Sequence, residues 1–170
     1  RRALDSQADL RHDSAGLSDA ELLQAIGAEA GHPEGMFFPD TYFYDHGSSD
    51  LALYKRAHQT LQGVLSESWD KRAPGLPYKT PMDALVMASI IEKETGAPEE
   101  RAMIAAVFIN RLRIGMRLQT DPSVIYGLGS RFDGNLRRTW KRTPPTTPIP
   151  GPACPPRPLP FRGLTPSTRP

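Results

Sequence analysis

Two glutamates that lie close together are the side chains of this sequence best placed for acid–base chemistry. Glu92 and Glu94 follow an uncharged run of eight residues, 84–91. At helical spacing each glutamate continues a different apolar stripe of that run, so spacing alone does not choose between them. Either carboxyl would lie at the C-terminal end of a helix, where the helix dipole and the apolar neighbours both favour the protonated form that a general acid requires. The alternative is a pair of solvated charges that ends the helix at the surface.

A second set of polar side chains consists of arginines in residues 111–131. They are Arg111, Arg113, Arg117 and Arg131, and apolar residues alternate with the first three. One interpretation is a basic groove for an anionic polymer. The other is a solvated helix end, where cations complement the helix dipole, and this simpler interpretation suffices for any single arginine.

Other kinds of active site lack their minimum parts. The four histidines, His12, His32, His46 and His58, show no spacing typical of metal ligands. The single cysteine is Cys154, so the rest of the chain has no thiol for disulfide, redox or metal chemistry. Neither a Gly-x-Ser-x-Gly turn nor a phosphate-binding glycine loop is present. We therefore expect neither a metal nor an organic cofactor.

The two glutamates are predicted to end one of two central helices. Residues 80–83 contain a threonine cap, a proline at the first helical position and an aspartate in the first turn, which predicts a helix start. The run 84–91 is apolar all round, which is typical of a buried helix, and Gly96 is expected to end it in the left-handed conformation. A second helix is predicted from Pro98 through the uncharged residues 102–109. Joined by so short a loop, the two helices are expected to pack antiparallel as the centre of the domain.

Elsewhere the pattern predicts further helices and small strands, so the expected fold class is α+β with a helical core. The expected elements are a helix from the capping box at residues 18–21, a helix from Ser48 or Ser49 to about Trp69, short strands within residues 37–44 and at 116–118, and a helical turn at 121–126. The strands are short and separated in the sequence, so the helices carry most of the predicted core.

The overall composition is that of an ordinary globular protein, but two different segments contribute to it. The chain has 170 residues, a net charge of +2 and 38% hydrophobic residues. Residues 139–170 contain 11 of the 18 prolines and five basic but no acidic residues, so residues 1–138 carry 16 basic and 19 acidic residues, a net charge of −3. A nucleic-acid-binding function inferred from the basic total would therefore rest on the tail. No run approaches the roughly 18 apolar residues of a membrane span, and no signal peptide is visible.

Five segments of the sequence form a set of long, ordered motifs. They are ASIIEKET at residues 88–95, VFINRL at 107–112, GMRLQTDP at 115–122, VIYG at 124–127 and EGMFFPDTY at 34–42. Together they resemble the endolytic murein (peptidoglycan) lytic transglycosylases over roughly residues 31–138. Motifs of this length in this order are far more specific than a single short pattern.

The resemblance implies a function and a site. Enzymes of this family cleave the β-1,4 bond between N-acetylmuramic acid and N-acetylglucosamine inside peptidoglycan glycan strands, leave a 1,6-anhydro end and terminate nascent strands. The family's catalytic glutamate corresponds to the second acid of Glu-Lys-Glu-Thr, which is Glu94. The resemblance makes other side chains candidates for binding the sugar rings, although each could equally serve a structural hydrogen bond. They are Asn110, Gln119, Asp121 and Tyr126.

The resemblance also implies a location and partners. It implies the periplasmic, extracytoplasmic face of the bacterial inner membrane, with a membrane anchor expected upstream of the present residues. Peptidoglycan synthases are candidate protein partners, and neither nucleic acid nor a cofactor is expected. Two other functions stay open. The chain could bind peptidoglycan without cutting it, or the arginines and the tail could bind nucleic acid, which fits less well with the net charge of −3 in residues 1–138.

The resemblance divides the chain into three parts. Residues 1–30 look like the end of a small LysM-like module, residues 31–138 form the catalytic domain, C-terminally truncated, and residues 139–170 are a proline-rich tail. We expect this tail to be disordered, because prolines remove backbone donors and its apolar residues are sparse. Codons for the tail can, in another frame, encode family motifs in order. Our hypothesis is therefore a single-base deletion near codon 138, and a genuine proline-rich linker is the alternative.

Overall fold

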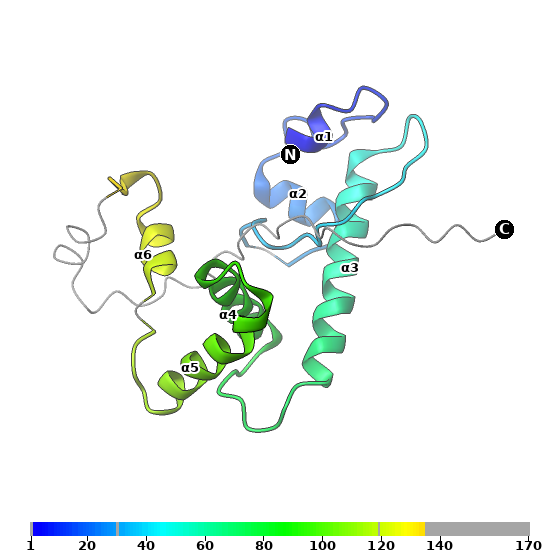
Figure 1. The fold of residues 1–170 in the computed structure, drawn as a ribbon. Helices are drawn as coiled ribbons and strands as arrows, with labels where there is room; N and C mark the ends of the chain where they lie inside the picture. The colour runs from blue at the N-terminus through cyan, green and yellow to red at the C-terminus, as the bar shows by residue number, and fades with distance from the viewer. Residues whose placement is uncertain (1, 30, 119, 135–170) are drawn as a thin grey trace. The chain divides into compact units, whose positions relative to one another are not determined.

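The computed structural model describes residues 2–29, 31–118 and 120–134, which form two compact units (Figure 1). We call residues 2–67 the N-terminal unit and residues 68–134 the C-terminal unit. The helices are, in chain order, α1 (Arg2–Asp5), α2 (Asp19–Ala25), α3 (Asp50–Asp70), α4 (Pro81–Glu94), α5 (Arg101–Arg113) and α6 (Asp121–Leu128), with the 3-10 turns η1 (Pro98–Glu100) and η2 (Gly129–Arg131). The part of the chain that is described is thus mostly helical.

Helix α2 begins where the capping motif predicted it. The Ser18 hydroxyl accepts a hydrogen bond from the Glu21 N–H (3.3 Å), and the Glu21 carboxylate accepts one from the Ser18 N–H (2.7 Å). These bonds satisfy backbone donors that a helix start otherwise leaves unpaired. Hydrogen bonds from the hydroxyl and the backbone of Ser18 also hold the pKa of Glu21 below its usual value. The helix then buries Leu22 and Leu23 against Tyr54 of α3, which forms the core of the N-terminal unit.

The aromatic residues 37–44 do not form a strand, so that prediction is wrong. The backbone N–H of Phe38 donates instead to the carbonyl oxygen of Ala57 in α3 (3.0 Å). The Phe37 ring packs on the Tyr54 ring, with 5.3 Å between their centroids. In a strand, backbone N–H groups donate to the carbonyl groups of a neighbouring strand, but here the Phe38 N–H donates to a carbonyl of α3.

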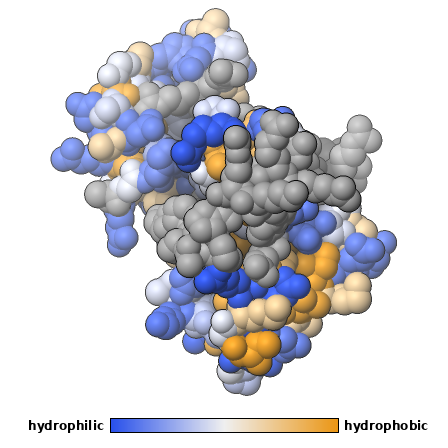
Figure 2. Space-filling model, turned by 90° about the vertical axis from the view of Figure 1, so that its left-hand side faces the viewer, coloured by the Kyte–Doolittle hydropathy of each residue, from blue (hydrophilic) through white to orange (hydrophobic). Residues whose placement is uncertain are grey.

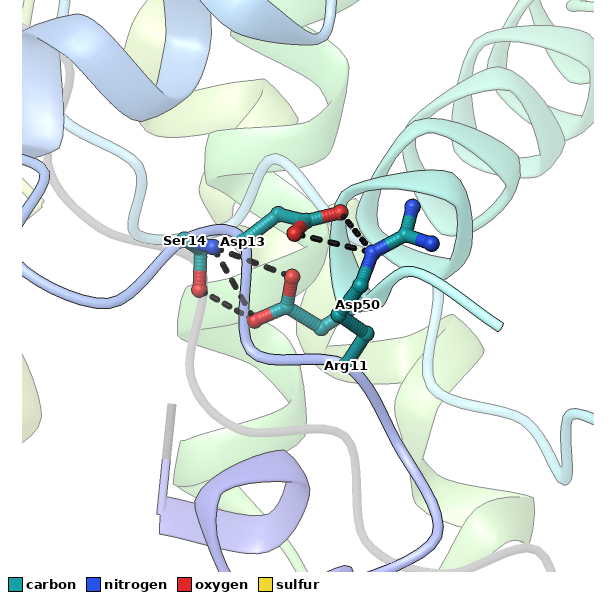
Figure 3. Close-up of polar contacts among 4 residues, drawn as sticks. All are labelled: Arg11, Asp13, Ser14 and Asp50. Atoms are coloured by element: carbon teal, nitrogen blue, oxygen red, sulfur yellow. Dashed lines mark hydrogen bonds and ion pairs between the residues drawn. The ribbon is translucent and has the colours of Figure 1, made fainter. Parts of the chain in front are cut away.

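A buried carboxylate ties the N-terminal segment to the start of α3 (Figure 3). Asp50, the first residue of α3, is 1% exposed and accepts hydrogen bonds from the backbone N–H of Ser14 (3.1 Å) and from the Ser14 hydroxyl. The Asp50 N–H donates to the carbonyl of Arg11 (3.0 Å), beside an isolated β-bridge between Arg11 and Ser49. Arg11 also forms an ion pair with Asp13 (2.9 Å). The charge of Asp50 is therefore buried together with its hydrogen-bond partners, as a buried carboxylate requires.

The C-terminal unit is built on α4, whose start is also capped as predicted. The Thr80 hydroxyl accepts a hydrogen bond from the Asp83 N–H (3.1 Å), and the Asp83 carboxylate accepts from the N–H groups of Thr80 (2.9 Å) and Lys79 (3.0 Å). Partial burial raises the pKa of Asp83, but the hydrogen bonds from Thr80 and Lys79 outweigh it, so that pKa lies below its usual value. Pro81 occupies the first helical position, where its missing N–H loses no bond.

The predicted contact between the two central helices is present, since α4 packs against α5, and α4 also contacts α6. The core of the C-terminal unit consists of Met87 and Ile90 of α4, Phe108 of α5 and Leu118. Leu118 belongs to the segment between α5 and α6. Burial of its side chain therefore fixes the chain just before α6 begins.

The two central helices are less buried than the uncharged runs predicted. Ala88 of α4 is exposed, and so is much of α5, including Met103 and Val107. Figure 2 shows hydrophobic side chains, in orange, exposed in the lower part of the view. Gly96 has no positive φ, and α4 ends instead on Thr95, whose backbone is extended. An apolar run predicts a helix that can be buried, but its neighbours decide how much of it is covered. Ala88 is the one exposed residue of the run 84–91 in α4, whereas four of residues 102–109 in α5 are exposed.

Residues 116–118 form no strand either. The Met116 N–H donates to the Arg111 carbonyl (2.7 Å), and the Arg111 guanidinium donates to the Leu118 carbonyl, so both ends of this segment bind back to α5. The strands of the α+β expectation are therefore absent from the part of the chain that the structure describes, and this part of the fold-class prediction is wrong.

Two predicted parts of the chain stay predictions. The proline-rich tail, residues 139–170, lies outside the described residues, so its expected disorder and its frameshift origin stay predictions. Residues 2–29 form α1, α2 and their connecting loops. The assignment of residues 1–30 to a LysM-like module therefore stays a prediction.

Candidate functional site

Glu94 is the last residue of α4, and its side chain is exposed. Its carboxylate makes no hydrogen bond or ion pair within the described part of the chain. The capped start of α4 and the packing of Met87 and Ile90 on Phe108 hold the helix that carries it. The arrangement therefore presents a carboxyl group to solvent at the end of a well-anchored helix, where a ligand can reach it.

Glu92, two residues earlier, has a structural partner. Its two carboxylate oxygens lie 2.8 and 3.0 Å from Nη2 of Arg101, at the start of α5. The Glu92 side chain is only 27% exposed, so the ion pair is partly shielded and links α4 to α5. Spacing left the roles of the two glutamates open. In the structure Glu92 is engaged by the fold, and the carboxylate of Glu94 is not.

A tight turn follows the last residue of α4. The Thr95 N–H donates to the Ile91 carbonyl (3.3 Å), and because the Thr95 backbone is extended, α4 ends here. The Thr95 hydroxyl donates to the Glu100 carboxylate (2.7 Å) and accepts from the Ala97 N–H (2.9 Å). Neither Glu100 nor Arg101 stands out in the sequence, because their partners lie five and nine positions earlier, across the turn.

The other four predicted site residues lie on the two helices that α4 contacts, or just before one of them. Asn110 is exposed on α5, Asp121 is exposed as the first residue of α6, and Tyr126 is 46% exposed on α6. Gln119 lies outside the described residues. Three helices that carry candidate side chains thus adjoin in one unit (Figure 1). No hydrogen bond joins Glu94 to any of these side chains within the described part.

The position of Asp121 is set by its neighbours. The Thr120 hydroxyl accepts from the Ser123 N–H (3.4 Å), and the Ser123 hydroxyl donates to the Thr120 carbonyl (2.8 Å), which begins α6. Thr120 is buried, and so is Leu118 two residues before it. An exposed carboxylate therefore follows directly on an anchored segment.

Two of the four arginines are engaged by the fold. The guanidinium groups of Arg111 and Arg113 donate to backbone carbonyl groups, the latter over 3.2 Å. Arg117 and Arg131 are exposed. Arg111 and Arg113 thus contact the backbone of their own unit, which neither of the two interpretations predicted, and a basic groove would have to rely on the other two.

The described residues offer no arrangement for a metal ion and no membrane span. Among them, no group of three or more His, Cys, Asp or Glu side chains is placed to hold a metal. None of their helices combines the length and the apolar character that crossing a bilayer requires.

Comparison with known proteins finds one matching family and two similar enzymes that we describe. Residues 2–148 match the model of the YceG-like family, a match that begins and ends outside residues 31–138. Over 108 residues the chain is 37% identical to the endolytic murein transglycosylase of Bacillus subtilis (strain 168), covering 60% of this chain and 28% of that protein. Over 97 residues it is 32% identical to the endolytic murein transglycosylase of Streptococcus pneumoniae serotype 2 (strain D39), covering 56% of this chain and 17% of that protein. The chain thus spans less than a third of the length of either relative.

Proposed function

Because the chain belongs to the YceG-like family, we propose that it acts as an endolytic peptidoglycan lytic transglycosylase, with Glu94 as its catalytic acid and base. Similarity to two endolytic murein transglycosylases supports the reaction. The bond cleaved is the β-1,4 bond between N-acetylmuramic acid and N-acetylglucosamine, and the product carries a 1,6-anhydro end. The exposed carboxyl of Glu94 at the end of α4 supports the assignment of the residue.

One carboxyl group suffices for this reaction. Most glycosidases need two, because a water molecule or an enzyme nucleophile must also take part. In a lytic transglycosylase the C6 hydroxyl of the muramic sugar is the nucleophile. Protonated Glu94 gives its proton to the leaving glycosidic oxygen, and the resulting carboxylate accepts the proton of the C6 hydroxyl as the 1,6-anhydro ring closes. Glu94 ends the cycle protonated, ready for the next bond.

A single observation carries the choice of Glu94 over its neighbour. Glu92 is held by Arg101 at 2.8 Å, and the carboxylate of Glu94 has no such partner within the described residues. A general acid must come within hydrogen-bonding distance of the oxygen that it protonates. A carboxylate bound to a guanidinium group is not available for that contact.

We place the sugar contacts at Asn110, Gln119, Asp121 and Tyr126. Amide, carboxylate and phenol groups can all hydrogen-bond to sugar hydroxyls. The Asp121 carboxylate would also stabilise the positive charge of an oxocarbenium-like transition state. The exposure of Asn110, Asp121 and Tyr126, on helices that contact α4, supports this role for three of the four.

Family membership also suggests where the protein works. We propose the extracytoplasmic face of the bacterial inner membrane, where nascent glycan strands are available. Cleavage inside a nascent strand would terminate it. Peptidoglycan synthases, which extend these strands, are therefore the protein partners that this proposal names.

Digestion of purified sacculi tests the proposal. The 170-residue chain is incubated with sacculi, and the soluble products are analysed by mass spectrometry. A lytic transglycosylase leaves 1,6-anhydro-N-acetylmuramic acid ends, which are lighter by one water than hydrolytic ends. A fragment that only binds peptidoglycan would sediment with the sacculi and release no such ends. Failure to do either, together with salt-dependent DNA binding, would favour the nucleic-acid alternative.

A further inference from the structure

Glu94 lies between two residues that contact the junction where η1 ends and α5 begins. On one side, the Glu92 carboxylate oxygens lie 2.8 and 3.0 Å from Nη2 of Arg101. On the other side, the Thr95 hydroxyl donates to the Glu100 carboxylate at 2.7 Å. The carboxylate of Glu94 itself takes part in neither contact. We call the two pairs, Glu92–Arg101 and Thr95–Glu100, the end clamp.

The end of a helix needs support of this kind to keep its last residue in place. The last turn of an α-helix leaves carbonyl groups without partners and frays easily. Here the Thr95 N–H closes on the Ile91 carbonyl (3.3 Å), and the Thr95 hydroxyl accepts from the Ala97 N–H (2.9 Å). One threonine thus ends the helix and shapes the turn that follows it.

We propose that the end clamp positions the Glu94 carboxyl for proton transfer, which makes Thr95 and Arg101 positioning residues, and this inference rests on the proposed function. The clamp fixes the backbone on both sides of Glu94 and leaves its carboxylate unengaged. Displacement of a reacting group by about 1 Å can lower a rate about 100-fold. A frayed helix end would displace Glu94 on that scale, so the clamp acts on the rate through the geometry of another residue.

Substitutions of Thr95, with a matched control on the same helix, test the proposal. Thr95→Val removes the hydroxyl and keeps the β-branched shape, and Thr95→Ser keeps the hydroxyl. Thr80→Val is the control, because Thr80 flanks the other end of α4 with the same hydroxyl and a similarly extended backbone. Release of 1,6-anhydro ends from soluble glycan strands gives kcat and KM, and thermal melting gives the stability of each variant.

Thr95→Val is expected to lower kcat about 10- to 100-fold and to change KM less than about threefold. Thr95→Ser is expected to keep kcat within about threefold of the unsubstituted chain. Thr80→Val should lower the melting temperature about as much as Thr95→Val, because each loses a hydroxyl that accepts a hydrogen bond from a backbone N–H, and should leave kcat within about twofold. Equal kcat values for Thr95→Val and Thr80→Val would overturn the proposal, because the clamp would then act on stability alone.

Hydrogen exchange at the Ala97 amide tests the clamp independently of activity. This N–H donates to the Thr95 hydroxyl at 2.9 Å, so Thr95→Val should speed its exchange about tenfold, and Thr95→Ser should not. If the unsubstituted chain releases no anhydro ends, the proposed function fails, and exchange remains the test of the clamp. Unchanged exchange in Thr95→Val would then overturn the clamp, and faster exchange would uphold it as a device that orders the end of α4.

Discussion

Each unit has a carboxylate at a helix end, and the two carboxylates differ in burial and in hydrogen bonding. Asp50 begins α3 in the N-terminal unit, where it is 1% exposed and bound by the backbone and the hydroxyl of Ser14. Glu94 ends α4 in the C-terminal unit, where it is exposed and its carboxylate has no hydrogen bond or ion pair among the described residues. The helix dipole favours a negative charge at the start of a helix, where Asp50 lies, and disfavours one at the end, where Glu94 lies.

The difference separates an acid whose contacts hold the fold from one whose carboxylate has no contact among the described residues, as our proposal for Glu94 requires. Asp50 has both a favourable helix end and hydrogen-bond donors, so its contacts account for its presence. The carboxylate of Glu94 has neither, and the polar contacts at that helix end are made by Glu92 and Thr95. Residues that break a local rule without a structural gain are the ones expected at functional sites.

Removing the carboxylate should lower the free energy of unfolding much more at Asp50 than at Glu94, and this is the largest effect that we expect. Asp50→Ala leaves the N–H and the hydroxyl of Ser14 buried without this acceptor and is expected to cost about 3 kcal/mol. At this chain length that corresponds to a fall in Tm of roughly 6–12 °C. Glu94→Ala should change the free energy of unfolding by about 0.5 kcal/mol or less. Thermal melting measures both variants, and similar losses would show that the two acids do not differ in this way.

A smaller effect is expected on the acid side of the stability curve. Each unit has a capping box whose carboxylate has a lowered pKa in the fold, Glu21 in one and Asp83 in the other. A lowered pKa stabilises the fold above the unfolded-state pKa, and this stabilisation is lost as pH falls through the folded-state value. Stability should therefore decline below about pH 5. Asp83→Asn should flatten that decline by less than about 1 kcal/mol, because Asp83 is largely exposed and Glu21 still titrates.

Melting temperatures recorded between about pH 7 and pH 3 check this expectation. Ser18→Ala is a useful companion, because it weakens the corresponding box of the N-terminal unit without removing a charge. An acid limb that is identical in Asp83→Asn and in the unsubstituted chain would contradict the role given to that carboxylate.

The smallest effect is expected at Ala88, on the exposed side of α4. The uncharged run 84–91 predicted burial on all sides, and on that basis an aspartate here would cost about 3 kcal/mol or more. Because Ala88 is exposed, Ala88→Asp should instead cost about 0.5 kcal/mol, through lower helix propensity. The expected fall in Tm is roughly 1–2 °C. A fall of about 6 °C or more would show that this side of α4 is covered.

The starts of α2 and α4 can be predicted from the sequence because their signals are local. In each case a hydroxyl cap is followed three residues later by an acid that completes the box. Other features of the fold have no such local signal in the sequence. The aromatic residues 37–44 have the composition of a strand, but they meet α3. Gly96 has the freedom to end α4, but Thr95 ends it one residue earlier through its extended backbone.

The position of one candidate site residue can be predicted in the same way. The sequence places Glu94 at the end of an apolar helix, and the family resemblance distinguishes it from Glu92. The ion pair that engages Glu92 depends on Arg101, nine residues away across a turn, and no spacing rule connects the two. The sequence also does not predict that Met103 and Ala88 are exposed, because an apolar run does not say which neighbours cover it.

The central claim is that Glu94, and not Glu92, transfers the proton in glycan cleavage, and a pair of isosteric substitutions tests it most directly. Glu94→Gln keeps the shape of the side chain but can neither donate nor accept that proton, so release of 1,6-anhydro ends should fall about 10²- to 10⁴-fold with the melting temperature unchanged. Glu92→Gln keeps an oxygen that can accept from Arg101, so the rate should fall about tenfold or less. Equal losses of activity from the two substitutions would contradict the assignment of Glu94.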